Sequence, residues 1–195
     1  MEREPSEARE HLLDAAEQLF MLRGYAAVRM HEVAAAAGIR QATLYHHFHG
    51  GKEELFIRVL ERYFARHHLG LNAALAAAVP NIRAQLYATS DWLLSQAPMD
   101  LARMAATDLP AINTAEAERL AKLAYTTLFT PIIQMLHRAQ QQGEIVHHDL
   151  ALIAGGVLGL ITALAPIPAY AIRQSRQEMA HELIDVMLNG LVPKR

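Results

Sequence analysis

Residues 37–56 read AGIRQATLYHHFHGGKEELF, and this stretch decides the fold of the N-terminal part of the chain. Gly38 interrupts a helical pattern, because glycine adopts the positive φ of a helix end at no steric cost. One short helix is predicted before it, over about residues 30–37, and another after it, over about 41–47. Two short helices joined by a glycine turn predict a helix-turn-helix, over about residues 29–48.

The residues around this turn allow the two helices to pack closely. Ala34 is small at the point where the helices are expected to meet, and Val33, Ile39 and Leu44 can form the seam between them. If Leu44 points inward, the other face of the second helix points outward, as the recognition helix of such a motif does in the major groove of DNA. The outward candidates are Arg40, Gln41, Thr43, Tyr45, His46 and His47.

These side chains suit contact with DNA. Arginine and glutamine can form paired hydrogen bonds to guanine and adenine edges. Thr43, Tyr45, His47 and Lys52 supply groups suited to phosphate, which positions a protein on DNA without specifying a sequence. The chain has a net charge of −2, but residues 29–52 contain three basic residues and one acidic residue. This local positive charge favours an anionic partner.

The same segment resembles the TetR family of bacterial transcriptional regulators, over about residues 9–56. The resemblance rests on LLDAAEQLFMLRGY, EVAAAAGIRQATLYHHF and KEELF. It implies that DNA is contacted by Gln41, Thr43, Tyr45, His46, His47 and Lys52, and Arg40 in the turn can also reach a base.

The chain departs from the family pattern in two places. A Ser or Thr usually caps the second helix and touches phosphate, but Val28-Arg29-Met30 stands there, so Arg29 is expected to supply the phosphate contact instead. The linker before Lys52 is also one residue longer than the commonest form.

Composition predicts an all-α protein of about nine helices. Alanine and leucine favour helix, and no segment alternates strictly between apolar and polar residues. We expect a DNA-binding domain over residues 1–51 and a ligand-binding and dimerisation domain over 52–195, with a helix over about 52–78 as connector. A first helix is predicted where Leu12, Ala15, Ala16, Leu19 and Phe20 recur at helical spacing before Gly24. Further helices are predicted over 82–96, 100–108, 115–142, 149–165 and 175–189.

Residues 150–172 carry no charge, but Pro166 and Pro168 should end the helix near Ala165. That leaves fewer than the roughly 20 residues needed to cross a bilayer. The acidic N-terminal MEREPSEARE does not resemble a signal peptide. We therefore expect a cytoplasmic protein without a membrane partner.

The last two long helices are predicted to form a homodimer. A stripe of small residues every fourth position lets another helix approach, and an apolar stripe follows on the final helix. The two stripes are Gly155, Gly159 and Ala163, and Met179, Leu183, Val186 and Met187. The family resemblance implies a four-helix bundle built from these helices, although both stripes also fit intrachain core.

The middle helices are predicted to bind an apolar or aromatic small molecule. The candidate residues are Trp92, Met104, Tyr125, Thr127 and Phe129. Pro131 removes an amide and displaces the carbonyl of Thr127, so we expect a kink that supplies the pocket with a polar group.

Other classes fit less well. No phosphate loop or nucleophile elbow is present, and the absence of cysteine excludes thiolate chemistry. The adjacent histidine pairs point about 100° apart on a helix and do not share one metal ion easily. We therefore expect no enzyme, cofactor or metal. The predicted function is a transcriptional regulator, most simply a repressor released from a palindromic operator by a small ligand; the alternative is an apolar-ligand carrier without DNA binding.

Overall fold

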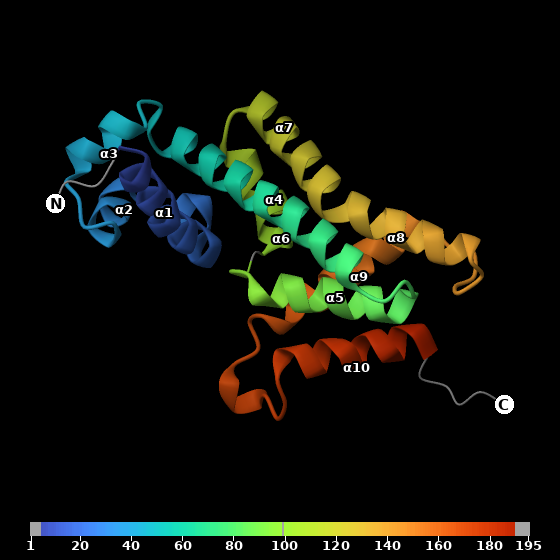
Figure 1. Cartoon of the computed structure of the whole chain (residues 1–195). Coiled ribbons are helices and arrows are strands. Elements are labelled where there is room, and N and C mark those ends of the chain that lie inside the picture. Colours follow the sequence, from blue (N-terminus) through green and yellow to red (C-terminus); the bar gives the residue numbers. More distant parts are fainter. Residues whose placement is uncertain (1–4, 99, 190–195) are drawn as a thin grey trace. The chain divides into compact units, whose positions relative to one another are not determined.

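A computed structural model of the chain describes residues 5–98 and 100–189, and every regular element in these ranges is helical (Figure 1). The longer helices are α1 (Pro5–Ala27), α2 (Met30–Ala36), α3 (Gln41–His47), α4 (Gly51–Ala77), α5 (Ile82–Ser95), α7 (Thr114–Ala124), α8 (Thr130–Gln141), α9 (Leu150–Leu164) and α10 (Arg176–Asn189). The short ones are α6 (Leu101–Arg103), η1 (Met104–Asp108), η2 (Leu109–Ala111), η3 (Tyr125–Phe129) and η4 (Ala169–Ala171). The predicted all-α class is confirmed.

The chain divides into two compact units. Unit 1 consists of Met1–Phe64 and Met99–Leu123, and unit 2 consists of Ala65–Pro98 and Ala124–Arg195. The helix predicted as a connector, α4, therefore begins in unit 1 and ends in unit 2. Unit 1 also includes α6, η1, η2 and α7, which the sequence assigned to the second domain.

The core of unit 1 is built on the inner face of α1. Leu12, Ala16 and Phe20 are almost completely buried, as their helical spacing predicts. The ring of Phe20 meets the edge of Phe56 with centroids 5.1 Å apart, which joins α1 to α4. On the rim, the guanidinium of Arg62 on α4 forms ion pairs with three carboxylates of α1, those of Glu10, Asp14 and Glu17.

Unit 2 is a bundle in which α10 packs on α5 and α9, and α8 packs on α9 (Figure 1). The inner faces are apolar, and Leu86, Ile132, Met135 and Val157 are almost inaccessible to solvent. Burial of such side chains provides the main stabilisation, about 1.5–3 kcal/mol for each large aliphatic group.

Two wide helical turns each precede a proline. In η1 the amide of Leu109 bonds to the carbonyl of Met104, and in η3 the amide of Thr130 bonds to the carbonyl of Tyr125. Each bond spans five residues, as in a π-helix. Pro110 and Pro131 follow directly, and a proline lacks an amide and crowds the carbonyl four residues before it. The kink expected at Pro131 thus takes the form of a π turn, and Pro131 is buried.

The helix α9 ends at Leu164, before Pro166, as predicted. Arg176 satisfies its last carbonyls by donating to the backbone oxygens of Leu164, Ala165 and Ile167. Among the described residues, no helix has both the length and the apolar character that spanning a membrane requires.

Candidate nucleic-acid interface

The turn between α2 and α3 has the expected geometry. Gly38 has a φ of 68°, a conformation that other residues rarely adopt. The amide of Gly38 bonds to the carbonyl of Ala35, and the amide of Ile39 bonds to that of Ala34, so the last carbonyls of α2 are satisfied. Val33 and Ala34 are buried at the seam, which confirms the predicted helix-turn-helix.

Few residues of α3 are buried, and most of the surface of this helix is exposed to solvent. Leu44 is its one fully buried side chain, and Phe48, which follows the helix, is also 0% exposed. The exposed residues are Arg40, Gln41, Thr43, Tyr45 and His46, and His47 is half-buried. Five of the six side chains predicted to face DNA are thus exposed, and the sixth is half-buried.

The start of α2 shows what replaces the missing Ser or Thr cap. Arg29 is the N-cap and is exposed, and its amide donates to the carboxylate of Glu32 at 2.8 Å. Arg23 donates to the same carboxylate, also at 2.8 Å. These bonds, led by that from Arg23, lower the pKa of Glu32 from its ordinary value of 4.5. Glu32 therefore makes the return bond of a capping box and leaves the guanidinium of Arg29 at the surface.

Lys52, predicted to contact DNA, is half-buried. Its ammonium lies 4.3 Å from the ring centroid of Tyr25 and donates to the carbonyl of Ala26 at 3.3 Å. Burial, and then the nearby charge of Arg29, lower the pKa of Lys52. Two cations, those of Arg29 and Lys52, therefore repel each other beside α3, and an anion placed near them would relieve this repulsion.

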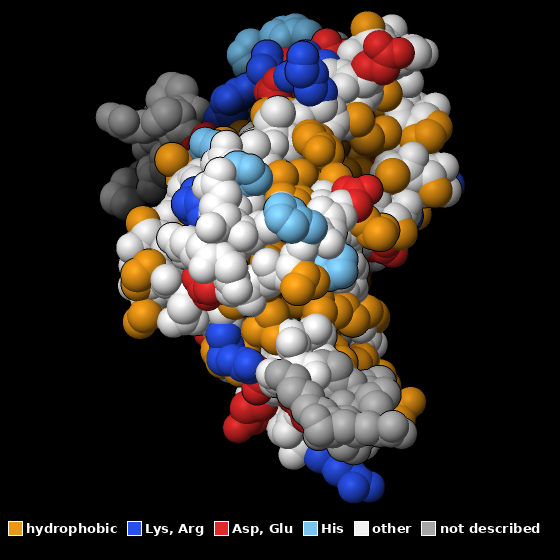
Figure 2. All heavy atoms as spheres, turned by 90° about the vertical axis from the view of Figure 1, so that its right-hand side faces the viewer, with side chains coloured by type: hydrophobic (Ala, Val, Ile, Leu, Met, Phe, Trp, Pro, Cys, Tyr) orange, Lys and Arg blue, Asp and Glu red, His pale blue; other side chains and the backbone are white. Residues whose placement is uncertain are grey.

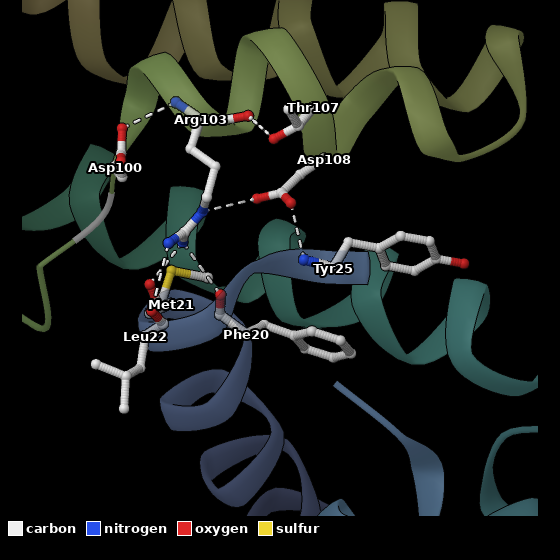
Figure 3. A network of polar contacts seen from close by, with 8 residues as sticks. All are labelled: Phe20, Met21, Leu22, Tyr25, Asp100, Arg103, Thr107 and Asp108. Atoms are coloured by element: carbon white, nitrogen blue, oxygen red, sulfur yellow. Dashed lines mark hydrogen bonds and ion pairs between the residues drawn. The ribbon is translucent and has the colours of Figure 1, made fainter. Parts of the chain in front are cut away.

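A buried polar cluster fixes the end of α1 (Figure 3). The side chain of Asp108, only 5% exposed, accepts a hydrogen bond from the amide of Tyr25 at 2.8 Å and from Nε of Arg103 at 3.3 Å. The other nitrogens of Arg103 donate to the carbonyls of Phe20, Met21 and Leu22. Gly24 interrupts α1, and the guanidinium takes the place of a C-cap for the part of α1 before this glycine.

The helix can turn away at this point because Gly24 has a φ of 78° and a ψ of 168°. A Cβ on Gly24 would lie 2.9 Å from Oδ1 of Asp108 and 3.1 Å from Nε of Arg103. Asp108 and Arg103 were not among the predicted site residues. They lie about eighty residues from the α1 residues that they contact, so no local pattern in the sequence predicts this pairing.

The residues predicted to bind a ligand do not gather at one place. Met104 is buried in unit 1, and the other four lie in unit 2. The rings of Tyr125 and Phe129 stack with centroids 5.4 Å apart, and Thr127 is buried with its hydroxyl donating to the carbonyl of Ala124. Trp92 packs against His67 instead, and its buried indole nitrogen has no hydrogen-bond partner among the residues that the structure describes.

The residues predicted to form a dimer lie on α9 and α10. Gly159 and Ala163 are exposed and Gly155 is half-buried. Met179, Leu183, Val186 and Met187 are half-buried, whereas Ala180 and Ile184 fill the core.

Two grooves are lined by other residues. In unit 1 a groove of about 500 Å³ carries Glu53, Glu61, Glu116 and Arg119. In unit 2 a groove of about 450 Å³ is mainly apolar, with Ile82, Leu86, Val146, Ile153 and Met187 among its walls. Figure 2 shows hydrophobic side chains and histidines exposed together on one face of the molecule.

Comparison with known proteins identifies the N-terminal domain. Residues 12–59 match the family described as bacterial regulatory proteins, tetR family. This part of the chain is therefore similar to the N-terminal domain of TetR-family regulators. The TetR-type domain includes α2, α3 and the start of α4, so it contains the whole surface described above.

Curated relatives match over 90 residues, less than half of the chain. The HTH-type transcriptional repressor NemR of Escherichia coli strain K12 is 32% identical over 90 residues, 46% of this chain and 45% of NemR. The HTH-type transcriptional activator FasR of Mycolicibacterium smegmatis is 38% identical over 90 residues, 45% of this chain and 41% of FasR. The match therefore spans less than half the length of these relatives, and one represses where the other activates.

A solved structure resembles the chain over a longer range. The TetR family transcriptional regulator PfmR from Thermus thermophilus aligns with a TM-score of 0.71, over 93% of this chain and 99% of PfmR. Its identity is 23%, so this likeness concerns the fold.

Proposed function

We propose that the protein is a transcriptional regulator that binds a palindromic DNA operator as a homodimer and releases it when a small molecule binds. The observation that carries this proposal is the surface of α3, where Leu44 alone is buried and every other residue except Ala42 is polar. A helix exposed in this way, next to a second helix packed across its start, is what entry into the major groove requires.

The groups on this surface divide into two roles. Arg40 and Gln41 lie at the N-terminal end of α3, where a recognition helix contacts base edges. Thr43, Tyr45 and His47 follow, with groups suited to phosphate. Arg29 and Lys52 add two cations nearby, and their mutual repulsion favours a phosphate over water as neighbour.

We infer a homodimer because the recognition helix α3 is short. A single α3 covers one half-site, and two copies related by a two-fold axis would read half-sites about 34–36 Å apart. The exposed small residues Gly159 and Ala163 on α9 support helix-to-helix contact between two copies. The half-buried Leu183 and Val186 of α10 support the same interface.

The ligand is proposed to bind in unit 2 and to be apolar or aromatic. The stacked rings of Tyr125 and Phe129 lie on the π turn η3, directly before the buried Pro131. The free indole nitrogen of Trp92 would donate a hydrogen bond to an acceptor on such a ligand. Repression is the simplest form of this regulation, although the same DNA contacts would serve an activator.

The test is selection of bound sequences from a random duplex pool with the purified full chain at moderate salt. Recovery of a palindrome is expected, and Gln41→Ala should then change the selected base at one position of each half-site. Recovery of no sequence by a protein shown to be folded would overturn the proposal and favour a ligand carrier without DNA binding.

A further inference from the structure

Three histidines gather at the carboxyl end of α3. His46 and His47 are its last two residues, and His49 follows the buried Phe48. The ring of His46 lies 5.9 Å from that of His47 and 6.0 Å from that of His49, measured between centroids. His46 and His49 are exposed and His47 is half-buried. His49 was not among the residues that the sequence predicted to contact DNA.

Charged groups on the neighbouring helices are bound to other partners. On α4, Glu54 accepts from the amide of Gly50, and Lys52 lies on the ring of Tyr25. On α2, Glu32 is held by Arg23. On α1, the guanidinium of Arg9 lies over the ring of Phe48. The remaining ionisable groups of α2 and α3 in this domain are Arg29, His31, Arg40 and Tyr45.

The three imidazoles themselves have no hydrogen bond or ion pair among the described residues, and their contacts are ring to ring. Within the same part of the chain, no group of three histidine and acidic side chains has the arrangement of a metal site. Glu32 and Glu54 bind the groups named above, and among the described residues neither of them pairs with an imidazole of this cluster.

We propose that His46, His47 and His49 form a phosphate-binding surface that takes up a proton when DNA binds. This inference rests on the proposed function. An imidazole changes charge between about pH 5 and 8, and its charged form donates from both nitrogens to an anion such as a phosphodiester.

The short distances between the three imidazoles also make their protonation depend on DNA. Positive charges on neighbouring rings repel each other across the roughly 6 Å between their centroids, and the solvent between exposed groups weakens this repulsion without removing it. A DNA phosphate beside the cluster attracts all of these charges and offsets the repulsion. The DNA-bound protein therefore holds more protons than the free protein.

The difference in bound protons between the DNA-bound and the free protein sets the direction in which pH changes the DNA affinity. Because the complex holds more protons, lowering the pH strengthens DNA binding and raising the pH weakens it. Each proton taken up changes the affinity by up to about tenfold per pH unit in the range where the imidazoles titrate. Each added cation that meets a phosphate also steepens the logarithmic salt dependence by about 0.9.

The experiment compares DNA affinity at pH 8 and pH 6, by fluorescence anisotropy, for the full-length wild-type chain and two multiple variants. The probes are a palindromic duplex recovered by selection and a random-sequence duplex at low salt. The test variant is His46→Gln with His47→Gln and His49→Gln, which keeps polar side chains but cannot gain charge. The control variant is His68→Gln with His148→Gln, which removes two exposed histidines of unit 2.

Wild type and control are expected to bind at least about tenfold more tightly at pH 6 than at pH 8, with a steeper salt dependence at pH 6. The triple variant should lose most of the pH dependence of its affinity and most of the increase in salt dependence at pH 6. His49→Lys, which places a permanent charge at the same position, should tighten binding at pH 8 and reduce the pH effect. Equal pH effects in wild type and triple variant would overturn the inference and leave the proposed function intact. Absence of binding to either duplex at both pH values would overturn the proposed function itself.

Discussion

The carboxylate of Asp108 accepts a hydrogen bond from the backbone amide of Tyr25, 83 residues earlier in the chain, at 2.8 Å. The adjacent guanidinium of Arg103 holds the last carbonyls of the regular part of α1. The segment that begins at Leu101 is thereby fastened to the end of the first helix of the TetR-type domain. The structural integrity of that domain should depend on residues well outside it in sequence.

Replacing Arg103 with methionine should lower the free energy of unfolding by about 3 kcal/mol, because Asp108 would remain buried without its cation. Urea denaturation at neutral pH measures this loss. Arg58→Met is the matched control, since Arg58 is half exposed and pairs with Glu61 at the surface, and it should cost less than about 1 kcal/mol. Similar small losses for both variants would show that the cluster contributes little.

Gly24→Ala should destabilise the protein by more than positive φ alone explains. The added Cβ would meet Oδ1 of Asp108 at 2.9 Å, besides the strain of the backbone conformation. Gly143→Ala is the control, because Gly143 has a φ of 75° and a Cβ there would meet nothing within 4 Å. We expect about 1 kcal/mol for Gly143→Ala and about 2–4 kcal/mol for Gly24→Ala in the same unfolding assay.

Gln41→Ala and Lys52→Met should separate base reading from phosphate contact. Gln41→Ala should cost about 1–3 kcal/mol at one base position and leave other sequences unaffected. Lys52→Met keeps an apolar stem against Tyr25 but removes the charge, so it should weaken all sequences alike and lower the salt slope by about one. Binding to a randomised half-site library at several salt concentrations measures both. The same loss across the library for both variants would contradict this division of roles.

Ala163→Arg should convert a dimer into a monomer if α9 forms the interface, because a buried, unpaired guanidinium is costly. Ala121→Arg is the control, since Ala121 is also an exposed alanine within a helix, in α7. Sedimentation equilibrium of both variants and the wild type gives their masses. A dimeric Ala163→Arg protein would place the interface elsewhere.

Acid should weaken the start of α2 through Glu32. Its pKa in the folded protein is lowered, chiefly by the hydrogen bond from Arg23, so the pair stabilises the fold above pH 4.5. That stabilisation is lost as the pH falls through the lowered pKa. Arg23→Gln should raise the pKa of Glu32 towards 4.5, which NMR titration of its carboxyl carbon measures. An unchanged pKa would mean that the amide of Arg29 suffices.

Much of this fold could be predicted because it depends on local patterns. Helix spacing around Leu12 and Phe20, the turn at Gly38 and the break before Pro166 each act within a few residues, and the structure has them where the sequence places them. The outward surface of α3 followed from the single inward position of Leu44.

Other features were out of reach because they depend on distant partners. The pairing of Asp108 with Tyr25 requires the tertiary fold, and the bond between Arg23 and Glu32 at the start of α2 joins residues nine positions apart. Pro131 indicated a disturbed helix but not that the disturbance would be a π turn. Lys52 was predicted to contact DNA because it matches the family pattern. That pattern does not show that the ammonium of Lys52 lies over the ring of Tyr25.

The π turn η1 has a consequence for chain length. Residues five apart in an α-helix point about 140° away from each other, whereas the five-residue hydrogen bonding of η1 lets Arg103 and Asp108 meet. Deleting one alanine between them would restore regular winding and leave Asp108 four residues after Arg103, a spacing that keeps both side chains on one face of an α-helix. The exposed Ala105 and Ala106 should therefore accept many substitutions, and the loss of one of them should remove the π turn but keep the pairing of Arg103 with Asp108.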